Sequence, residues 1–188
     1  MLKHIREFRK SLAIAGFRNA KISDVKNFLE KVKACLGKDV EFQFFDAKLV
    51  ATWQHLYFSS LNALKAFQNK ENISKSLAME AMLYASAQRQ IQRAVELLGI
   101  KPNSSEIAVI IIGGDPKNVK LALASLAKLI NAERDDRVLM LSEEKIDAIK
   151  RAFDISEVEV KASMAGDDRE KAIVNLVIER MALLATQR

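Results

Sequence analysis

The residues Gly113-Gly114-Asp115-Pro116 lie where α/β proteins often bind phosphate, between an apolar run and a helical pattern. The glycines would let the backbone approach an anion closely, but their spacing matches neither of the phosphate-binding glycine motifs. Asp115 also suits a helix N-cap, with Pro116 as the first helical residue, and its carboxylate would then occupy the amides that a phosphate needs. A structural turn is the favoured interpretation. A nucleotide- or phosphate-binding enzyme that uses Gly113 to Lys117 is the alternative.

A thiol nucleophile or a metal site needs cysteine and histidine partners, and the chain contains few. Cys35 is the one cysteine, and His4 and His55 are the two histidines. This set is too small for a closed zinc site, excludes an intramolecular disulfide, and leaves a Cys-His catalytic pair dependent on the fold. We expect Cys35 to be a buried free thiol in a reducing setting, with no metal and no cofactor.

Adjacent carboxylates occur at Asp135-Asp136, Glu143-Glu144 and Asp167-Asp168. Paired acids can act as general acid and base. Glu143-Glu144, however, follows Ser142 in the first turn of a predicted helix, where acids interact favourably with the helix dipole. We interpret all three pairs as caps and solvated turns, and we assign no catalytic residue.

Alternating strands and helices must position these residues. The patterns predict strands over residues 6–8, 12–17, 40–45, 107–112, 138–141 and 158–160. They predict helices over 25–36, 52–68, 74–98, 116–131, 143–153 and 168–186, the first capped by Ser23 and ended by Gly37. Without internal repeats or a long linker, residues 1–188 are expected to form one domain. Its predicted class is mixed α/β (α+β), a small mixed sheet packed by several helices.

The predicted helix from Ser74 to Leu98 has two distinct faces. Its apolar stripe contains Leu77, Tyr84, Ala87, Ile91, Val95 and Leu98. Its opposite face contains Lys75, Met82, Ser86, Arg89 and Arg93. Three of these residues are cations, and we expect the methionine to be exposed. Glu80 falls inside the apolar stripe, where an unpaired carboxylate would be costly, so we expect an internal ion pair or capping contact.

The same segment carries a family resemblance. Residues Asn72-Ile73-Ser74, then Met79 to Ile91, and then Ala94 and Gly99-Ile100 are similar to the pattern N-I-S, E-x-L-L-Y-x-S-G-x-R-Q-I. That pattern is typical of the small non-catalytic subunit of the KEOPS complex, the PRPK-binding protein family, in its archaeal type. The resemblance covers most of the chain. Ala87 departs from it, because the family usually has glycine there.

The resemblance implies a non-catalytic adaptor that binds and assists the atypical kinase subunit of KEOPS. It also implies recruitment of tRNA, through the 3′ CCA end, for threonylcarbamoyl-adenosine modification. On this basis we assign Lys75, Arg89, Gln90 and Arg93 to tRNA binding. Met82, Ser86 and Ala87 are assigned to packing against the protein partner.

The charge distribution is uneven. The chain of 188 residues has a net charge of +6, and residues 1–38 contain ten Lys/Arg against three acids. A polyanion partner and an ordinary solvated basic face both explain this asymmetry. The N-terminus does not resemble a signal peptide, and the apolar run 107–112 is far shorter than a membrane span, so we expect a cytoplasmic protein without membrane contact. A purely structural homodimer is a third hypothesis.

Overall fold

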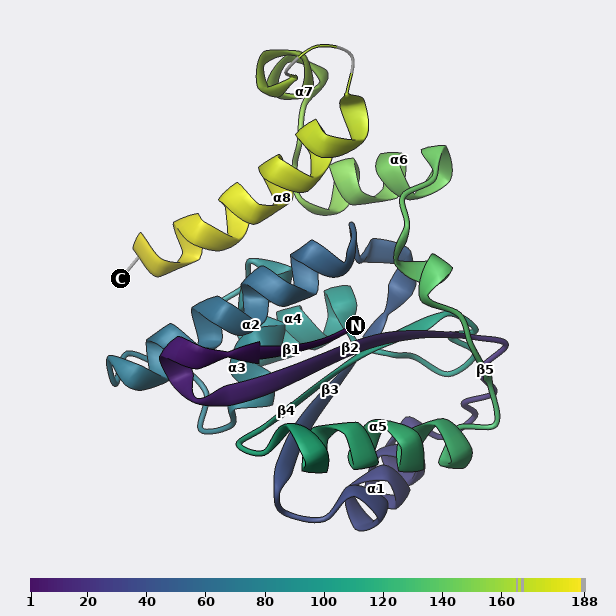
Figure 1. Cartoon of the computed structure of the whole chain (residues 1–188). Coiled ribbons are helices and arrows are strands. Elements are labelled where there is room, and N and C mark those ends of the chain that lie inside the picture. The colour runs from purple at the N-terminus through teal and green to yellow at the C-terminus, as the bar shows by residue number, and fades with distance from the viewer. Residues whose placement is uncertain (165, 167, 187–188) are drawn as a thin grey trace.

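The computed structural model describes residues 1–164, 166 and 168–186, and its centre is a five-stranded sheet (Figure 1). The strands are β1 (Leu2–Ile5), β2 (Lys10–Arg18), β3 (Val40–Asp46), β4 (Ile107–Gly113) and β5 (Glu133–Arg134). The α-helices are α1 (Val25–Leu36), α2 (Trp53–Gln68), α3 (Leu77–Ser86), α4 (Ile91–Leu98), α5 (Pro116–Leu129), α6 (Glu143–Ala152), α7 (Glu157–Ser163) and α8 (Arg169–Thr186). Three 3-10 helices are η1 (Arg6–Phe8), η2 (Ala47–Leu49) and η3 (Asp136–Leu139).

The strand order is β1-β2-β4-β3, and β5 adds a short pairing to the end of β2. Each pairing among the described strands is antiparallel, so the sheet is antiparallel rather than mixed. The predicted mixed α/β (α+β) class is confirmed.

The two central strands, β2 and β4, are buried on both sheet faces. Alternate side chains of a strand point to opposite faces. Leu12, Ile14 and Ile110 accordingly enter one apolar cluster, whereas Phe17 and Ile111 enter the other. This explains why β4 is a continuous apolar run instead of an alternating one.

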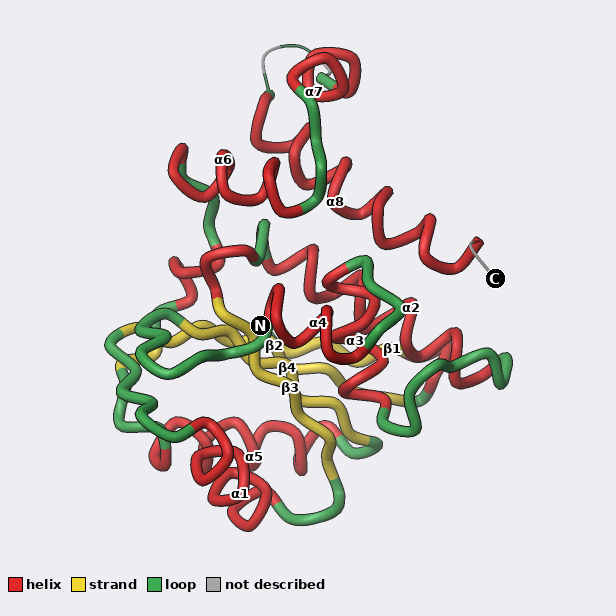
Figure 2. Tube along the Cα trace, turned by 180° about the vertical axis from the view of Figure 1, so that it is seen from behind, coloured by secondary structure: helices red, strands yellow, loops and turns green. Residues whose placement is uncertain are grey.

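Helices form layers on both sides of the sheet. In Figures 1 and 2, α1 and α5 cover one face, α2, α3 and α4 cover the other, and α6 to α8 lie beyond α2. A third apolar cluster, which includes Ile149, Phe153, Ile173 and Val177, holds α6, α7 and α8 together, and α8 packs on α2 and α3.

Most of the predicted elements are confirmed. The strands over 12–17, 40–45 and 107–112 are present, and five of the six predicted helices begin and end within two residues of their predicted bounds. The cap of α1 differs from the prediction, since Asp24 and not Ser23 accepts the hydrogen bond from the Asn27 amide, at 3.0 Å. Asp167, of the third acid pair, lies outside the described residues, and Asp168 accepts a hydrogen bond from the Lys171 amide of α8.

Three predicted strands are wrong, because residues 6–8, 138–141 and 158–160 contribute to helical segments. Three or four alternating residues fit a helical turn as well as a strand, and local caps decide between them. Ser156 and Glu159 form a reciprocal capping box that starts α7, and Asp135 caps η3 through the Arg137 amide.

Candidate binding surface at the junction of helices α3 and α4

The predicted single helix over 74–98 is wrong, because the chain turns at Ala87. This residue adopts the left-handed conformation, with φ 51° and ψ 33°. Its amide donates to the Tyr84 carbonyl at 2.9 Å, and the Gln88 amide donates to the Leu83 carbonyl at 3.1 Å. This is the Schellman arrangement that ends a helix, in which glycine is favoured because it lacks a Cβ atom. The glycine usual in the family therefore suits a helix end, and α4 begins four residues later.

The break rotates α4 relative to α3, and α3 itself is buried on nearly all sides, so the predicted exposed face is not present. Met82 and Ser86, expected on the exposed face, are buried in the core. Ile91 and Val95, expected in the core stripe, are 46% and 39% exposed. Of the three residues assigned to partner packing, only Ala87 keeps accessible surface, and it contacts the third apolar cluster.

The four residues assigned to tRNA binding all lie on the surface. Lys75 lies in the loop before α3, Arg89 and Gln90 in the turn between the helices, and Arg93 in the first turn of α4. All four side chains are therefore accessible to a ligand.

Glu80 fixes the loop that carries Lys75. Its carboxylate is buried, with 1% of the residue exposed. It accepts a hydrogen bond from the Ser74 amide at 2.7 Å and from the Ile73 amide at 3.0 Å. The expected internal partner is therefore present, but it consists of loop amides before α3 and not of an ion pair or a helix cap. Amides that donate to a buried carboxylate make strong hydrogen bonds, and here they tie the N-I-S segment to α3.

A second acid holds the other end of this loop. Glu41 of β3 accepts a hydrogen bond from the Ser76 hydroxyl at 2.9 Å and from the Ala78 amide at 3.1 Å. Ser76 also caps α3 by accepting from the Met79 amide. Lys75 is therefore presented on a loop fastened on both sides, which reduces the conformational entropy that a ligand would have to remove.

An apolar groove lies beside this surface. It has a volume of about 330 Å³ and runs between α1 and the α3–α4 pair. Val95 of α4, Met79 of α3 and Phe42 of β3 contribute to its wall. The α1 residues Lys26, Glu30 and Lys33 also line it. The sequence did not reveal it, because the helical pattern had placed Val95 in the core. The exposed residues Ile73, Ile91 and Val95 give the junction apolar as well as cationic character.

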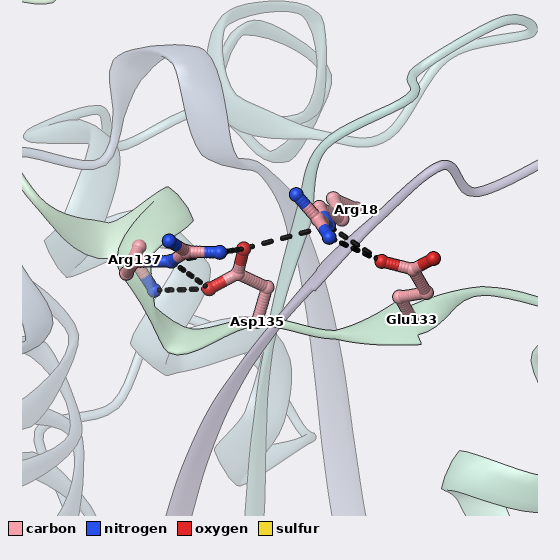
Figure 3. Close-up of polar contacts among 4 residues, drawn as sticks. All are labelled: Arg18, Glu133, Asp135 and Arg137. Carbon is pink, nitrogen blue, oxygen red and sulfur yellow. Dashed lines mark hydrogen bonds and ion pairs between the residues drawn. The ribbon is translucent and has the colours of Figure 1, made fainter.

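Another concentration of charge, at β5 and η3, is internally neutralised (Figure 3). Arg18 pairs with Glu133 at 2.6 Å and with Asp135 at 3.5 Å, while Arg137 pairs with Asp135 at 2.9 Å. The hydrogen bonds from Arg137 lower the pKa of Asp135 to about 2. These contacts join β2 to the segment after β5. Asp135 is therefore a cap and an ion-pair partner, as predicted for the first acid pair.

Lys145 of α6 lies next to this cluster, and burial lowers its pKa to about 8. Its ammonium group donates to the carbonyl oxygens of Val138 and Met140 at 2.9 and 3.1 Å. Ser142 caps α6 through the Lys145 amide, and Glu143-Glu144 lies in the first turn as predicted. Lys145 thus fastens η3 to α6.

The Gly113-to-Lys117 turn is structural, as the favoured interpretation held. The Asp115 carboxylate accepts from the Lys117 amide at 2.8 Å, and Pro116 occupies the first helical turn. A Cβ atom on Gly113 would approach Val119 and Val40 side chains at 2.9 and 3.0 Å, so close packing explains this glycine. The carboxylate occupies the position that a phosphate would take.

The expectation of a buried Cys35 is wrong, since this free cysteine is exposed on α1. His55 lies in the core, where both ring nitrogens are hydrogen-bonded, and His4 contacts the Ser11 hydroxyl at 3.0 Å. Among the described residues, no group of three His, Cys, Asp or Glu side chains is arranged to hold a metal ion. The described helices include none that is both long and apolar enough to cross a bilayer.

The amino-acid sequence is similar to that of a known family. Residues 20–185 match the family described as kinase binding protein CGI-121. The chain is also 31% identical over 144 residues to the regulatory protein Cgi121 of Methanocaldococcus jannaschii, across 77% of this chain and 85% of that protein.

Proposed function

We propose that this chain, which belongs to the CGI-121 family of kinase-binding proteins, is the non-catalytic adaptor of a KEOPS complex. In this role it binds and assists the atypical kinase and recruits tRNA, through the 3′ CCA end, for threonylcarbamoyl-adenosine modification. The names of the family and of its archaeal relative, kinase binding and regulatory, support the first half and a role without catalysis. The surface at the α3–α4 junction supports the second.

The observation that carries the tRNA half is the mixture of exposed cations and exposed apolar side chains at one junction. Lys75, Arg89 and Arg93 provide positive charge for phosphates. Ile91 and Val95 provide apolar surface for unstacked bases. Single-stranded RNA is bound by cations that follow the backbone and by aromatic rings or Arg planes on which the bases stack. The guanidinium planes of Arg89 and Arg93 would provide part of that stacking here.

The groove beside α4 extends this surface. Phe42 offers an aromatic ring within it, and Lys26 and Lys33 offer two cations against the single acid Glu30. A short unpaired RNA end fits such a groove better than a duplex, because a duplex keeps its bases stacked and inaccessible to a narrow apolar pocket. The 3′ end of a tRNA has this unpaired form.

A filter-binding titration tests the tRNA half, with tRNA that carries or lacks its CCA end. We expect the double variant Arg89→Ala/Arg93→Ala to bind intact tRNA at least about tenfold more weakly than the wild type. The slope of log affinity against log salt should fall by about 0.7 for each phosphate that the variant no longer neutralises. Removal of the CCA end should weaken the wild type and leave the double variant little changed.

The matched control is Lys117→Ala/Lys120→Ala, which removes the same charge from α5 on the opposite side of the sheet. If the two double variants lose affinity equally, general electrostatic attraction explains binding and the junction has no special role. The kinase half is tested separately by purification of the tagged chain from its own organism, where the kinase and its associated ATPase-like modification enzyme should co-purify.

A further inference from the structure

The turn that joins β1 to β2 carries a group of cations at the surface. Arg6 and Arg9 are exposed and Lys10 is half-buried, and we call these three residues the basic hairpin tip. None of the three forms an ion pair with a described residue. Arg18, at the other end of β2, pairs with two carboxylates. The positive charge of the tip is therefore available to a ligand.

The backbone holds this turn in one conformation. The Arg9 amide donates to the Arg6 carbonyl at 3.2 Å, and Arg9 adopts the left-handed conformation with φ 49°. Directly beside the turn, Ile5 pairs with Lys10, and the pairing of β1 with β2 continues to Leu2 and Ala13. An ordered turn loses less conformational entropy on binding than a flexible loop does.

The basic hairpin tip lies beside the loop that carries Lys75. One cavity of about 390 Å³ is lined by Arg9 and Lys10 of the tip and by Leu77, the first residue of α3. In Figure 1 the tip lies at the same end of the molecule as the C-terminal end of α2, which lines this cavity too. The tip therefore borders the surface at the α3–α4 junction, to which Lys75 belongs.

Two acids line the same cavity but neutralise this charge only in part. Glu41 accepts hydrogen bonds from the Ser76 hydroxyl and the Ala78 amide at 2.9 and 3.1 Å, so it serves the loop before α3. Glu7 is exposed and forms no ion pair with a described residue. With Lys75 included, four cations stand against these two acids, and the surface keeps a net positive charge.

The chemistry of this surface suits phosphates better than bases. Phe8 and Phe67, which line the cavity, are half-buried and pack against the core, so little ring surface is open for base stacking. Arginine forms bidentate hydrogen bonds with phosphate oxygens. An RNA duplex presents its phosphates while its bases stay stacked. The tip therefore fits the backbone of a duplex, which it would contact without reading the nucleotide sequence.

We propose that the basic hairpin tip binds the phosphate backbone of the base-paired stem that adjoins the unpaired 3′ end of the tRNA. This inference rests on the tRNA half of the proposed function. The unpaired end contacts the α3–α4 junction, and the stem that continues from it contacts Arg6 and Arg9. The second contact is independent of nucleotide sequence and depends steeply on salt.

A filter-binding titration of the full chain with three RNAs tests this contact. The RNAs are a minihelix of the acceptor stem with its unpaired CCA end, the same minihelix without that end, and a single strand that ends in CCA. We expect Arg6→Gln/Arg9→Gln to weaken both minihelices about tenfold and to leave the single strand unchanged. For the minihelices, the slope of log affinity against log salt should fall by about 0.9 for each phosphate no longer neutralised.

Two further variants separate charge from folding. Arg6→Lys/Arg9→Lys keeps the charge and should retain most of the minihelix affinity. Arg6→Gln alone leaves the left-handed Arg9 in place and should give about half the change in salt slope. It remains informative if the double variant fails to fold, which thermal unfolding identifies.

Lys117→Ala/Lys120→Ala is the control for general attraction, because it removes two exposed charges from α5 across the sheet. Wild-type minihelix affinity in folded Arg6→Gln and Arg6→Gln/Arg9→Gln proteins would overturn the inference. An equal loss in the α5 control would overturn it too, and so would an equal loss for the single strand, because the tip would then contact the unpaired end. Failure of the wild type to bind any of the three RNAs would instead contradict the tRNA half of the proposed function.

Discussion

His55 of α2 donates a hydrogen bond from Nε2 to the carbonyl oxygen of Ala85 in α3, at 2.7 Å. Its Nδ1 accepts a hydrogen bond from the Ala51 amide at 3.2 Å, so the ring is held as the neutral Nε2–H tautomer. The ring also packs edge to face on Phe153, 5.7 Å away between centroids. One imidazole therefore joins the last turn of α3, the start of α2 and the C-terminal helices.

This arrangement predicts a specific pH dependence. Burial lowers the pKa of His55 from 6.5 to about 4. The unfolded chain therefore takes up a proton between these values while the folded protein does not. The stability that the folded protein owes to a neutral His55 is therefore fully present above pH 6.5. As the pH falls from 6.5 toward 4, the unfolding free energy decreases by roughly 3 kcal/mol.

Urea denaturation of the wild type and His55→Gln at pH 7 and pH 4 measures this effect. The variant should be destabilised at pH 7, and the difference should shrink by roughly 3 kcal/mol at pH 4, since the variant has no proton to take up. Ser59→Ala, another buried change in α2, removes no titrating group, so its difference from the wild type should not vary with pH. A constant difference for His55→Gln would mean that the histidine titrates alike in both states.

Ala87 predicts a gain in stability. A left-handed conformation costs a residue with a Cβ atom about 1 kcal/mol or more, and glycine avoids this cost but loses more entropy on folding. We expect Ala87→Gly to raise the unfolding free energy by about 0.5 to 1 kcal/mol and the Tm by about 2 °C. Ala124→Gly is the control, because Ala124 is exposed inside α5 and the same change should destabilise by about 1 kcal/mol. Equal losses in both variants would refute the strain at Ala87.

The two residues Ala87 and Glu80 show how far the sequence determined the site. The costly position of Glu80 in an apolar stripe predicted a hydrogen-bonding partner, and the structure confirms one. The partner itself was not predictable, because amides of a loop six and seven residues earlier have no side-chain pattern. The turn at Ala87 was missed because alanine is the best helix former and disfavours the left-handed region.

That one missed turn explains the errors on α4. A helix continued through residue 87 places Val95 inside, whereas the real turn exposes it. Met82 is buried for a different reason, because neighbouring elements cover α3 on nearly all sides. The fold class was more predictable than the surface, since buried strands such as β4 depend on many apolar residues at once. The residues that a surface exposes can change with the conformation of one residue, as those of α4 do with the left-handed conformation of Ala87.

Glu80 supplies the last prediction, because it connects folding to binding. Glu80→Gln keeps the shape of the side chain but removes the charge that strengthens the two amide hydrogen bonds, so we expect a loss of roughly 2 kcal/mol in unfolding free energy. The loop that carries Lys75 should loosen, and tRNA affinity should fall in the same variant. Glu96→Gln is the control, because Glu96 is exposed on α4 and contacts only Gln92 among the described hydrogen bonds. It should change stability by less than about 0.5 kcal/mol. A Glu80→Gln protein as stable as the wild type, yet weaker in tRNA binding, would show that the carboxylate orders the loop without supporting the fold.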